Sequence, residues 1–541
     1  MRIALLSPYD DRCYGMRMIA SVLRQHGHEV ALIIFKQFVV KPVSLEQLEA
    51  LRHPPPGKPS PATETLEEGD YYLSYPEPVS ETEWQLFLGK LTDYRPDLIG
   101  VGLTTPTYEA ALEVTRRLKS ELPNVPVIWG GIHPTINPEQ CIEQADMVCI
   151  GEGEHAMVEL AQDPERTDVL GLWRRSHGGI VRNRIRPLEQ DLDSFPFASW
   201  GENEWIVDWN QLVALPASNR GYFRGIYFTM TQRGCPFSCT YCFNHVRKEQ
   251  QRGERYVRRR SVEHSLAECE QRARDFDLPG FPFNDDVFVK DLEWLEEFAE
   301  KYPRRVGLPF GGYIHPAVSD KEMVRVLAGA GLRFVTFGVQ SGSQYIAHEV
   351  YNRRHSFDAI VELAQFCESQ GLELVYDVLS NCEYESEADC LQTLRLLMRL
   401  PRPRLLQVKG LGVFPPMKIS TLRLPKHCLP ETTFEFWNLL YLMTRHREIA
   451  AEQLLALSRD EYLKAHPEAL RAVALALKQK EAAVRNSREE IERLQKAGGR
   501  EANVRGLWRK ARSLIGRRLP KPVAEGVRSV LTHLRRAEAG R

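Results

Sequence analysis

The sequence lacks several features that would mark a membrane, secreted or disordered protein. No run of about 18 uncharged apolar residues occurs, which excludes a membrane-spanning helix. The start, MRIALLSPYDDR, has too short an apolar stretch for a signal peptide. Only 11 of the 541 residues are cysteines, an odd number, so we expect a reducing cytoplasm rather than a disulfide scaffold. The 43% hydrophobic and 26% charged fractions are typical of a globular protein, and the length suggests about three domains.

Net charge is also nearly absent, at −1, but this value is a cancellation. Residues 500–541 carry 12 Lys and Arg against 3 Asp and Glu, a net charge of +9 that leaves −10 on the rest. Within them, residues 504–519 place apolar side chains on one helical face and arginines opposite. Such a helix can pack on the protein or lie on an anionic membrane surface, giving peripheral membrane association. Nucleic acid is disfavoured, because the body is acidic and has no basic domain interleaved with aromatics.

Strand and helix patterns alternate over residues 1–160 and predict an α/β fold with a doubly wound parallel sheet. Residues 41–80 are rich in proline and predict an irregular insertion. Residues 161–220 lack clean periodicity and predict a linker. The expected strands are 2–6, 30–35, 97–103, 125–130 and 146–150.

A second alternating series occupies residues 221–428 and predicts a partial (β/α)6 barrel of the TIM type. From residue 429 to 541 the pattern is helical, ending in the basic amphipathic tail. The expected barrel strands are 226–232, 280–284, 306–310, 333–338, 372–379 and 404–409.

Three cysteines crowd into the run RGCPFSCTYC, just after the first strand of the second series: Cys235, Cys239 and Cys242. Thiolates on one short loop suit a soft metal centre, either zinc or an iron–sulfur cluster. A closed zinc site needs four ligands, and the other cysteines form no second close pair. His245 could be a fourth ligand, so the spacing leaves zinc open. Three ligands on a four-iron cluster would leave one iron free for a reaction.

The CxxxCxxC spacing, with the aromatic Tyr241 before the last cysteine, resembles the radical S-adenosylmethionine (SAM) superfamily. The resemblance implies that the cysteines hold a [4Fe–4S] cluster whose open iron binds SAM. It also implies reductive cleavage of SAM to a 5′-deoxyadenosyl radical, with an electron donor of the flavodoxin or ferredoxin type as partner.

Two further segments extend this resemblance over roughly residues 220–425, and imply SAM contacts. FNDDVF contains Asp285 and Asp286 at the end of a barrel strand, although a helix N-cap with a first-turn acid is the alternative for this pair. GVQSGS contains Gln340 and Ser341 at the end of another strand. Gln340 stands where similar proteins have a carboxylate, so an amide replaces an acid there.

The amino-terminal unit resembles the cobalamin-binding domain that precedes many radical SAM barrels, through WGGIHPT at 129–135 and GEGE at 151–154. Paired glycines at a strand end let a ligand approach the backbone closely. A dinucleotide is disfavoured, because G-x-G-x-x-G is absent after the first strand. The resemblance implies cobalamin contacts from Thr104, Thr105, Gly130, Gly131, His133, Gly151 and Gly153.

One departure concerns the lower ligand of cobalt. Many cobalamin domains carry D-x-H-x-x-G after the first strand, whereas this chain has Arg12 at the histidine position. A guanidinium cannot ligate a metal, so we expect cobalt to lack a protein imidazole. Cys13 is expected to be a loop thiol, and His133 to cap a turn or contact the nucleotide tail. The basic run at 255–261 is expected to be either a solvated face or a SAM-carboxylate and interdomain contact.

The resemblance implies an enzyme that methylates an unactivated carbon, or phosphorus, of a small-molecule or lipid-like biosynthetic substrate. One SAM would methylate cobalamin, and a second would generate the substrate radical that takes the methyl group. No catalytic side chain is assigned. The alternatives are a non-methylating rearrangement, oxidation or cyclisation, an RNA-modifying methylthiotransferase, and a zinc-binding scaffold. Methylthiotransferases carry additional amino-terminal cysteines that bind a second cluster. In this chain Cys13, Cys141 and Cys149 show no obvious matching arrangement.

Overall fold

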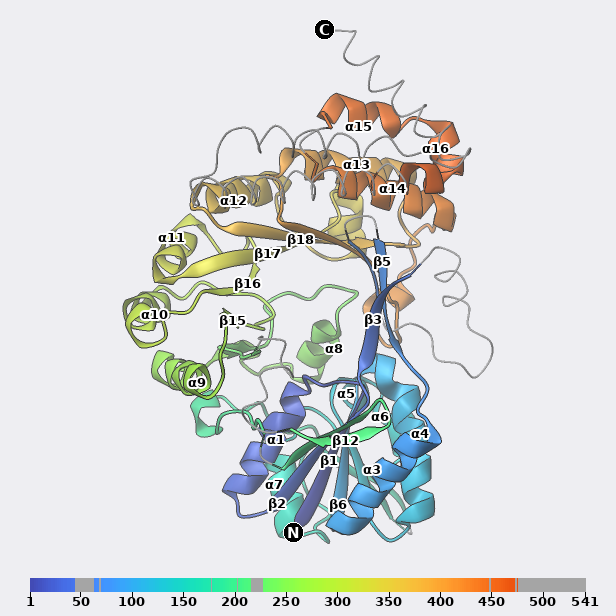
Figure 1. Cartoon of the computed structure of the whole chain (residues 1–541), viewed down its shortest axis with the longest axis vertical. Helices are drawn as coiled ribbons and strands as arrows, with labels where there is room; N and C mark the ends of the chain where they lie inside the picture. Colours follow the sequence, from blue (N-terminus) through green and yellow to red (C-terminus); the bar gives the residue numbers. More distant parts are fainter. Residues whose placement is uncertain are drawn as a thin grey trace, which may run out of the picture.

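The computed structural model describes residues 1–43, 63–67, 70–176, 178–201, 203–215, 227–446, 449–471 and 474. The expected basic tail lies outside these residues. Two sheets organise the described chain: a doubly wound domain that carries the amino terminus, and above it an arc of strands with helices on its outer side (Figure 1).

The amino-terminal sheet has a parallel centre, as expected. Successive residues of β1 point to opposite faces, so that Ile3 and Leu5 pack in one core while Ala4 and Leu6 pack in the other. Burial on both faces explains why these strands read as continuous apolar runs. The strands of this centre are β1 (Arg2–Pro8), β2 (Glu29–Phe35), β6 (Leu98–Gly102), β7 (Val127–Gly130) and β8 (Met147–Cys149).

Helices cover both faces of this sheet. The first core contains side chains of α1 (Tyr14–Gln25) and α7 (Glu154–Gln162). The second contains side chains of α3 (Glu81–Tyr94), α4 (Tyr108–Glu121) and α6 (Pro138–Ile142). The doubly wound prediction is therefore confirmed.

Residues 161–220 differ from the expected linker, because they complete the same sheet. β9 (Leu172–Ser176) and β10 (Gly179–Arg182) extend the edge beside β8, and β11 (Glu204–Asp208) and β12 (Gln211–Ala214) extend the edge beside β2. β9, β10 and β12 are short and partly exposed, and β11 is buried but only five residues long, so these strands lack the apolar runs by which the central strands could be predicted.

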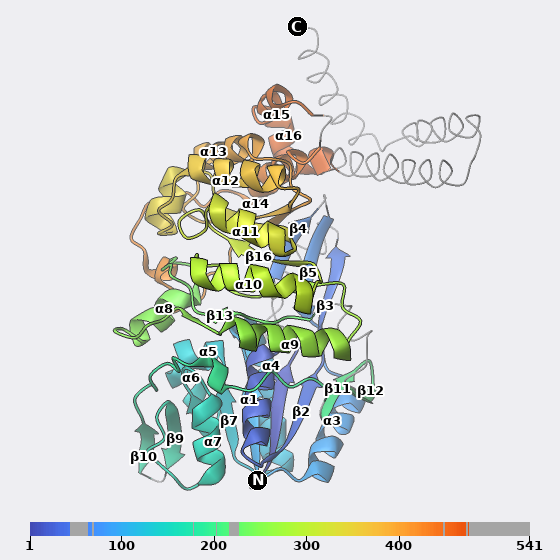
Figure 2. The same cartoon turned by 90° about the vertical axis from the view of Figure 1, so that its left-hand side faces the viewer.

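The second sheet has the predicted partial barrel as its core. Its parallel strands are β15 (Phe281–Pro282), β16 (Phe310–Ile314), β17 (Leu332–Gln340), β18 (Glu373–Ser380) and β19 (Leu405–Gly410). The expected first strand is reduced to a parallel bridge between Thr229 and Phe283. Figure 2 shows the outer helices one above another, namely α9 (Val262–Asp275), α10 (Leu292–Arg305), α11 (Lys321–Ala330) and α12 (Phe357–Ser369), and α13 (Glu387–Arg399) follows them.

The proline-rich insertion is not wholly irregular. It contributes three antiparallel strands, β3 (Phe38–Val43), β4 (Thr63–Glu67) and β5 (Asp70–Pro76), and β4 pairs with β19. A segment of the first domain thus extends the barrel sheet to eight strands. Pro42 is compatible with this arrangement, because β3 is the edge strand of the sheet.

The last described elements are helical, as expected. α14 (Glu431–Met443) packs against α13 and β19, and α15 (Ala451–Leu457) and α16 (Glu461–Ala465) follow. None of the helices in the described ranges is long and apolar enough to cross a membrane.

Candidate functional site

A cavity of about 520 Å³ lies where the two domains meet. One wall is formed by the carboxyl ends of β1, β6, β7 and β8, the edge at which doubly wound sheets bind ligands. The other wall comes from the start of the barrel, through Arg233, Gly234, Phe243, Arg247 and Asp286. Eight glycines line the cavity: Gly15, Gly100, Gly102, Gly130, Gly131, Gly151, Gly153 and Gly234.

Five of the residues implied for cobalamin line this cavity: Thr104, Gly130, Gly131, Gly151 and Gly153. Gly131 has φ +108°, and a Cβ atom there would stand 2.6 Å from the carbonyl oxygen of Leu103. Only glycine fits this position. The glycines leave bare backbone along the wall, which suits a large flat ligand lying against it.

Thr105 and His133, also implied for cobalamin, are not among the lining residues. The His133 Nε2 atom lies 3.2 Å from the amide oxygen of Gln140, and its Nδ1 atom lies 3.1 Å from the hydroxyl of Thr105. Since the amide oxygen can only accept, Nε2 carries the proton and Nδ1 accepts from Thr105. Burial lowers the pKa of His133, so the ring is neutral. Its contacts with Thr105 and Gln140 support the cavity wall without facing the cavity.

The loop after β1 is organised by Asp10. Its carboxylate accepts hydrogen bonds from the backbone N–H groups of Arg12, at 3.0 Å, and Cys13, at 3.1 Å. Both residues line the cavity, and the Arg12 guanidinium lies over the ring of Phe228 at 4.2 Å. Burial raises the pKa of Cys13 to about 12, so its thiol is protonated. No histidine occurs among the described residues that line this cavity.

The three cysteines of the motif follow the two-residue strand β13 (Gln232–Arg233), and Cys242 is the N-cap of α8 (Phe243–Gln250). A helix amino terminus favours a negative charge on a thiolate. Burial raises the pKa of Cys235 to about 12 and that of Cys242 to about 11, and Asp286 adds to both shifts. Cys235 and Cys242 are therefore thiols that lose their protons when they bind iron.

His245 does not complete a zinc site in this structure. Its Nδ1 atom lies 2.6 Å from the carbonyl oxygen of Cys242, and its Nε2 accepts from the backbone N–H of Lys418 at 3.2 Å. Over the described ranges, no three His, Cys, Asp or Glu side chains are grouped as ligands of one metal ion. Ligands of a four-iron cluster bind different irons and stand further apart, so the loop fits a cluster better than a single zinc ion.

The paired carboxylates separate into two roles. Asp285 accepts hydrogen bonds from the backbone N–H groups of Thr231, at 2.7 Å, and Gln232, at 3.0 Å, and from the Thr231 hydroxyl. Burial raises the pKa of Asp285 to about 6. Asp286 faces the cavity instead, and desolvation raises its pKa. The N-cap alternative is wrong, because α10 begins six residues later with Asp291 as its cap.

Around Gln340 the structure reveals a residue that sequence reasoning missed. Gln340 has φ 62°, and its Oε1 atom is buried without a hydrogen-bond partner. Arg353 places Nη1 3.6 Å from the Cys239 sulfur and 3.5 Å from the Tyr241 hydroxyl, while its Nη2 donates to the Gly338 carbonyl at 2.6 Å. Its Nε also has no partner. A free acceptor and a free cationic donor beside the cysteine loop suit a ligand that carries both an ammonium and a carboxylate.

Two other implied residues hold the structure together around this point. Ser341 is buried, lies 3.3 Å from the Thr393 hydroxyl, and accepts from the Ser343 backbone N–H at 3.2 Å. Tyr241 packs edge-on against Tyr351, with ring centroids 5.0 Å apart.

A pair of histidines beside Arg353 was also missed. The rings of His315 and His355 are 5.2 Å apart, and His315 packs against Phe237 of the cysteine loop at 4.3 Å. Burial, with the charge of Arg353, lowers the pKa of His315 to about 2 and that of His355 to about 4. Both rings are therefore neutral. The Nε2 atom of His315 and both ring nitrogens of His355 have no partner.

The basic run at 255–261 is not a uniformly solvated face, because Arg255 is exposed whereas Arg258 and Arg260 are buried, and Arg258 makes an interdomain contact. The buried Arg258, in β14 (Arg258–Arg259), binds Glu152 through two bonds of 2.7 and 2.9 Å. Arg233 binds Glu154 at 2.7 Å and Glu152 at 3.3 Å. The GEGE segment therefore lines the cavity with its glycines while its glutamates bind the barrel.

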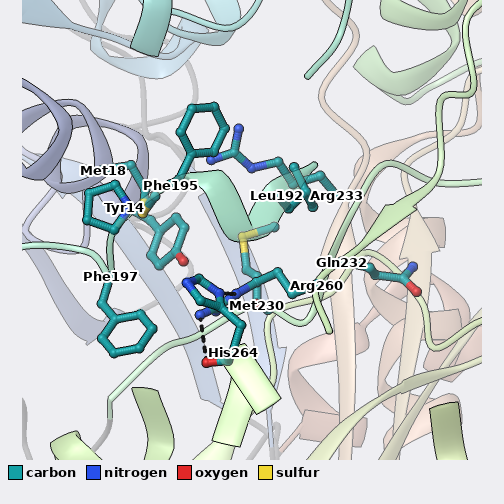
Figure 3. Close-up of a pocket in the computed structure, with 11 residues that line it drawn as sticks. Tyr14, Met18, Leu192, Phe195, Phe197, Met230, Gln232, Arg233, Arg260 and His264 are labelled. Carbon is teal, nitrogen blue, oxygen red and sulfur yellow. Dashed lines mark hydrogen bonds between the residues drawn. The ribbon is translucent and has the colours of Figure 1, made fainter. Parts of the chain in front are cut away.

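A second, much smaller pocket of about 20 Å³ lies beside this contact. In Figure 3, Tyr14 of α1 lies near Arg260 and His264 of the barrel, and Arg260 is bonded to His264. Tyr14, Met230 and Arg233 line both pockets, so they form the partition between them. The small pocket has room for a water molecule but not for a cofactor.

Comparisons with known proteins agree with this architecture. Residues 78–161 match the B12 binding domain model, and residues 229–397 match the Radical SAM superfamily model. The chain therefore combines a B12 binding domain with a radical SAM domain, a combination that supports cobalamin, SAM and a [4Fe–4S] cluster as its cofactors.

The chain resembles several individual members. It is 26% identical to the anaerobic magnesium-protoporphyrin IX monomethyl ester cyclase of Cereibacter sphaeroides over 49% of this chain and 43% of the relative. It is 22% identical to the cytidylyl-2-hydroxyethylphosphonate methyltransferase of Streptomyces wedmorensis over 66% of this chain and 67% of the relative. The fold also resembles the solved structure of the cobalamin-dependent SAM radical enzyme OxsB with aqua-cobalamin bound. The match covers 100% of this chain and 81% of OxsB, with a TM-score of 0.59 and 15% sequence identity. The chain spans about half the length of the first curated relatives it matches.

Proposed function

We propose that this protein is a cobalamin-dependent radical SAM methyltransferase acting on an unactivated carbon, or on phosphorus, of a small molecule. The observation that carries the proposal is the shared cavity, which joins the glycine-lined strand ends of the B12 domain to the start of the barrel beside the cysteine motif. When bound, cobalamin supplies a transferable methyl group, and the cluster with SAM supplies the radical that activates the substrate.

The residue assignments follow the geometry. Cys235, Cys239 and Cys242 would hold the cluster. Arg353 and Gln340 would take the carboxylate and the ammonium of SAM, since they present the unpartnered donor and acceptor beside Cys239. Asp286 lines the cavity between the two domains and is our candidate for a further SAM contact.

Cobalamin would lie against Thr104 and the glycines of the strand ends, with Arg12 and Cys13 near its lower face. Arg12 cannot ligate cobalt, and the protonated thiol of Cys13 is a poor ligand. We therefore propose that cobalt has no imidazole from the protein. Thr105 and His133 would act behind the wall, by fixing its shape.

The inner face of the barrel supports a substrate with polar groups. Asp377 on β18 is buried and pairs with Lys409 of β19 at 3.0 Å, while its Oδ1 atom has no partner. Tyr313 of β16 is partly exposed, and burial of its hydroxyl, together with the charge of Asp377, raises the pKa of that hydroxyl. A purely aliphatic substrate would leave this carboxylate oxygen unsatisfied, at a cost of about 1–3 kcal/mol.

Two alternatives differ in support. Cyclisation or another non-methylating reaction is the second candidate, because the chain also resembles a cyclase. The methylthiotransferase alternative has less support, because Cys13 and Cys149 line the cavity while Cys141 is buried in the core on the other face of the sheet. These three thiols cannot share a second cluster.

Anaerobic purification with iron, sulfide and hydroxocobalamin tests the class. We expect about four irons and one cobalamin per chain. Incubation with SAM and a low-potential reductant should yield 5′-deoxyadenosine together with S-adenosylhomocysteine, whereas deoxyadenosine alone would favour the non-methylating reactions. Zinc in place of iron, without cobalamin, would refute the proposal. Comparing metabolites in cells with and without the gene then searches for the methylated product.

Two partners are proposed for this chain, an electron donor and an anionic membrane surface. The cluster needs one electron for each cleavage, so we propose a flavodoxin or ferredoxin type of donor. We also propose that residues 500–541 contact an anionic membrane surface. Deleting them should abolish sedimentation with phosphatidylserine vesicles, and unchanged sedimentation would remove this idea.

A further inference from the structure

The GEGE segment and the cysteine motif are joined by a compact ion-pair cluster, which consists of Glu152, Glu154, Arg233 and Arg258. Each pair crosses between the domains, because the glutamates follow β8 and the arginines stand on the β13–β14 ribbon. All four side chains are largely buried, with exposures between 2 and 19%. Charges this well enclosed are weakly screened by salt and hold a defined geometry.

The cluster touches both cofactor walls at once. Gly151 and Gly153 alternate with the glutamates and line the cavity against which cobalamin would lie. On the other side, Arg233 is separated from Cys235 only by Gly234. Gly234 has φ +92°, and a Cβ atom there would stand 2.3 Å from the Tyr256 carbonyl oxygen. The connection from the ion pairs to the first cysteine is therefore short and leaves little freedom.

From this we infer that Glu152 and Glu154 are positioning residues that set the separation between the cobalamin and the cluster with its SAM. The inference rests on the proposed function through the presence of both cofactors. The pairs contribute more than fold stability, because they fasten a loop that lines the cobalamin wall to the strand that leads into the cysteine loop. Arg258 also donates to the Glu189 carbonyl at 2.7 Å, which fixes the ribbon independently of Arg233.

The test uses E152Q and E154Q in the full-length protein reconstituted with iron, sulfide and hydroxocobalamin. Glu159 offers a matched control, because it lies on α7 and pairs with Arg186 at 2.6 Å inside the first domain. After reduction to cob(II)alamin and [4Fe–4S]⁺, electron paramagnetic resonance measures the magnetic coupling between the two centres. We expect a uniform coupling in the wild type and E159Q, and a weaker, heterogeneous coupling in E152Q and E154Q at unchanged cofactor content.

Two products give a second readout that needs no substrate. Formation of 5′-deoxyadenosine depends on the barrel alone, whereas S-adenosylhomocysteine forms only when the methyl group of SAM reaches the reduced cobalamin. Misplacement by about 1 Å can slow a reaction about 100-fold, so we expect the ratio of S-adenosylhomocysteine to deoxyadenosine to fall by up to this factor in E152Q and E154Q.

The charge-swapped variant E154R/R233E separates positioning from folding. Restored coupling and product ratio in the swap, against their loss in R233E alone, would support the inference. Wild-type coupling and ratio in both E152Q and E154Q would overturn it. A wild-type protein that takes up neither iron nor cobalamin would instead refute the proposed function, and the inference with it.

Discussion

At the scale of single residues, the cysteine motif and its surroundings carry different amounts of information. The three thiols of Cys235, Cys239 and Cys242 fall within eight positions, and this spacing alone predicts a metal centre. Arg353 does not, because 114 residues separate it from Cys239 and only the return of the chain after β17 brings them together. The same holds for His315, which follows β16 and approaches the cysteine loop only through the fold, whereas Gln340 was already indicated by the GVQSGS segment. Such constellations come from the topology of the fold and not from local spacing.

The first prediction concerns the three cysteines. C235A, C239A and C242A should each lose the iron–sulfur absorption and all 5′-deoxyadenosine formation, because three ligands leave no spare one. C428A should change neither, since Cys428 is exposed and far along the chain from the motif. H245A should retain iron, because both ring nitrogens bond to the backbone. Iron and sulfide analysis of the purified variants gives the answer, and loss of metal in H245A with zinc bound in the wild type would contradict it.

The second prediction concerns Asp285 and pH. Its pKa is raised to about 6 in the folded protein from an ordinary 3.8, so the native state binds a proton more tightly than the unfolded state. Stability contributed by the protonated carboxyl is therefore present below about pH 4 and is lost as the pH rises to about 6. In D285N this loss should be absent, and the difference in thermal midpoint between the wild type and D285N should change across pH 4–6. A constant difference would show that Asp285 titrates normally.

D285A tests the hydrogen bonds of the same carboxylate. It leaves the N–H groups of Thr231 and Gln232 without their acceptor just before the cysteine loop. We expect a loss of about 2–4 kcal/mol in the free energy of unfolding, whereas D285N keeps an acceptor oxygen and should lose less than about 1 kcal/mol. Urea unfolding measures both, and equal losses would contradict the assignment.

At the scale of secondary-structure elements, the buried parallel strands could be predicted and the edges could not. β1, β2, β6, β7 and β8 are apolar on both faces, so their sequence runs are unmistakable. β9, β10 and β12 are short and partly exposed, β11 has only five residues, and β3 to β5 stand among prolines that interrupt the pattern. Their partners lie far away in the sequence, and a hydrogen-bonded edge leaves no local signature. The strands of the insertion and of residues 161–215 are therefore absent from the sequence pattern for the same physical reason.

A third prediction uses two glycines at the carboxyl end of β7, Gly130 and Gly131. G130A should fold, because a Cβ atom there would meet only Cys149 at an ordinary 3.7 Å, yet it adds a methyl group to the cavity wall. We expect its dissociation constant for hydroxocobalamin to rise at least about tenfold, and the free energy of unfolding to change little. G131A should lose stability as well, because its backbone cannot accept a side chain.

The matched control is G89A in the interior of α3, where a Cβ atom has no neighbour within 4 Å. It should bind cobalamin normally and gain about 0.5–1 kcal/mol of stability, because alanine restricts the unfolded chain. Spectroscopic titration and urea unfolding measure the set. Unchanged cobalamin affinity in G130A would place the corrin away from this wall.

At the scale of the whole molecule, the boundary of the first domain lies later than the sequence periodicity suggests. A fragment of residues 1–160 lacks four of the nine strands of its sheet and exposes the edges of β2 and β8. We expect it to aggregate and to show no cooperative thermal transition, because unpaired edges are aggregation sites. A fragment of residues 1–215 contains the complete sheet and should unfold cooperatively. Circular dichroism on both fragments decides, and a cooperative, equally stable 1–160 would contradict the prediction.

The strand ribbon β3 to β5 limits how an architecture of this kind can be recombined. The chain leaves the first domain after β2, contributes three strands to the edge of the barrel beside β19, and returns to build α3. A cobalamin module therefore cannot be exchanged as a cassette with one junction, because a single cut would sever a continuous sheet of the other domain. A working chimaera would need junctions near residues 37 and 78 as well as one after residue 215, so that the ribbon always travels with its barrel. The two domains therefore cannot be exchanged independently, because three strands encoded within the first domain belong to the sheet of the second.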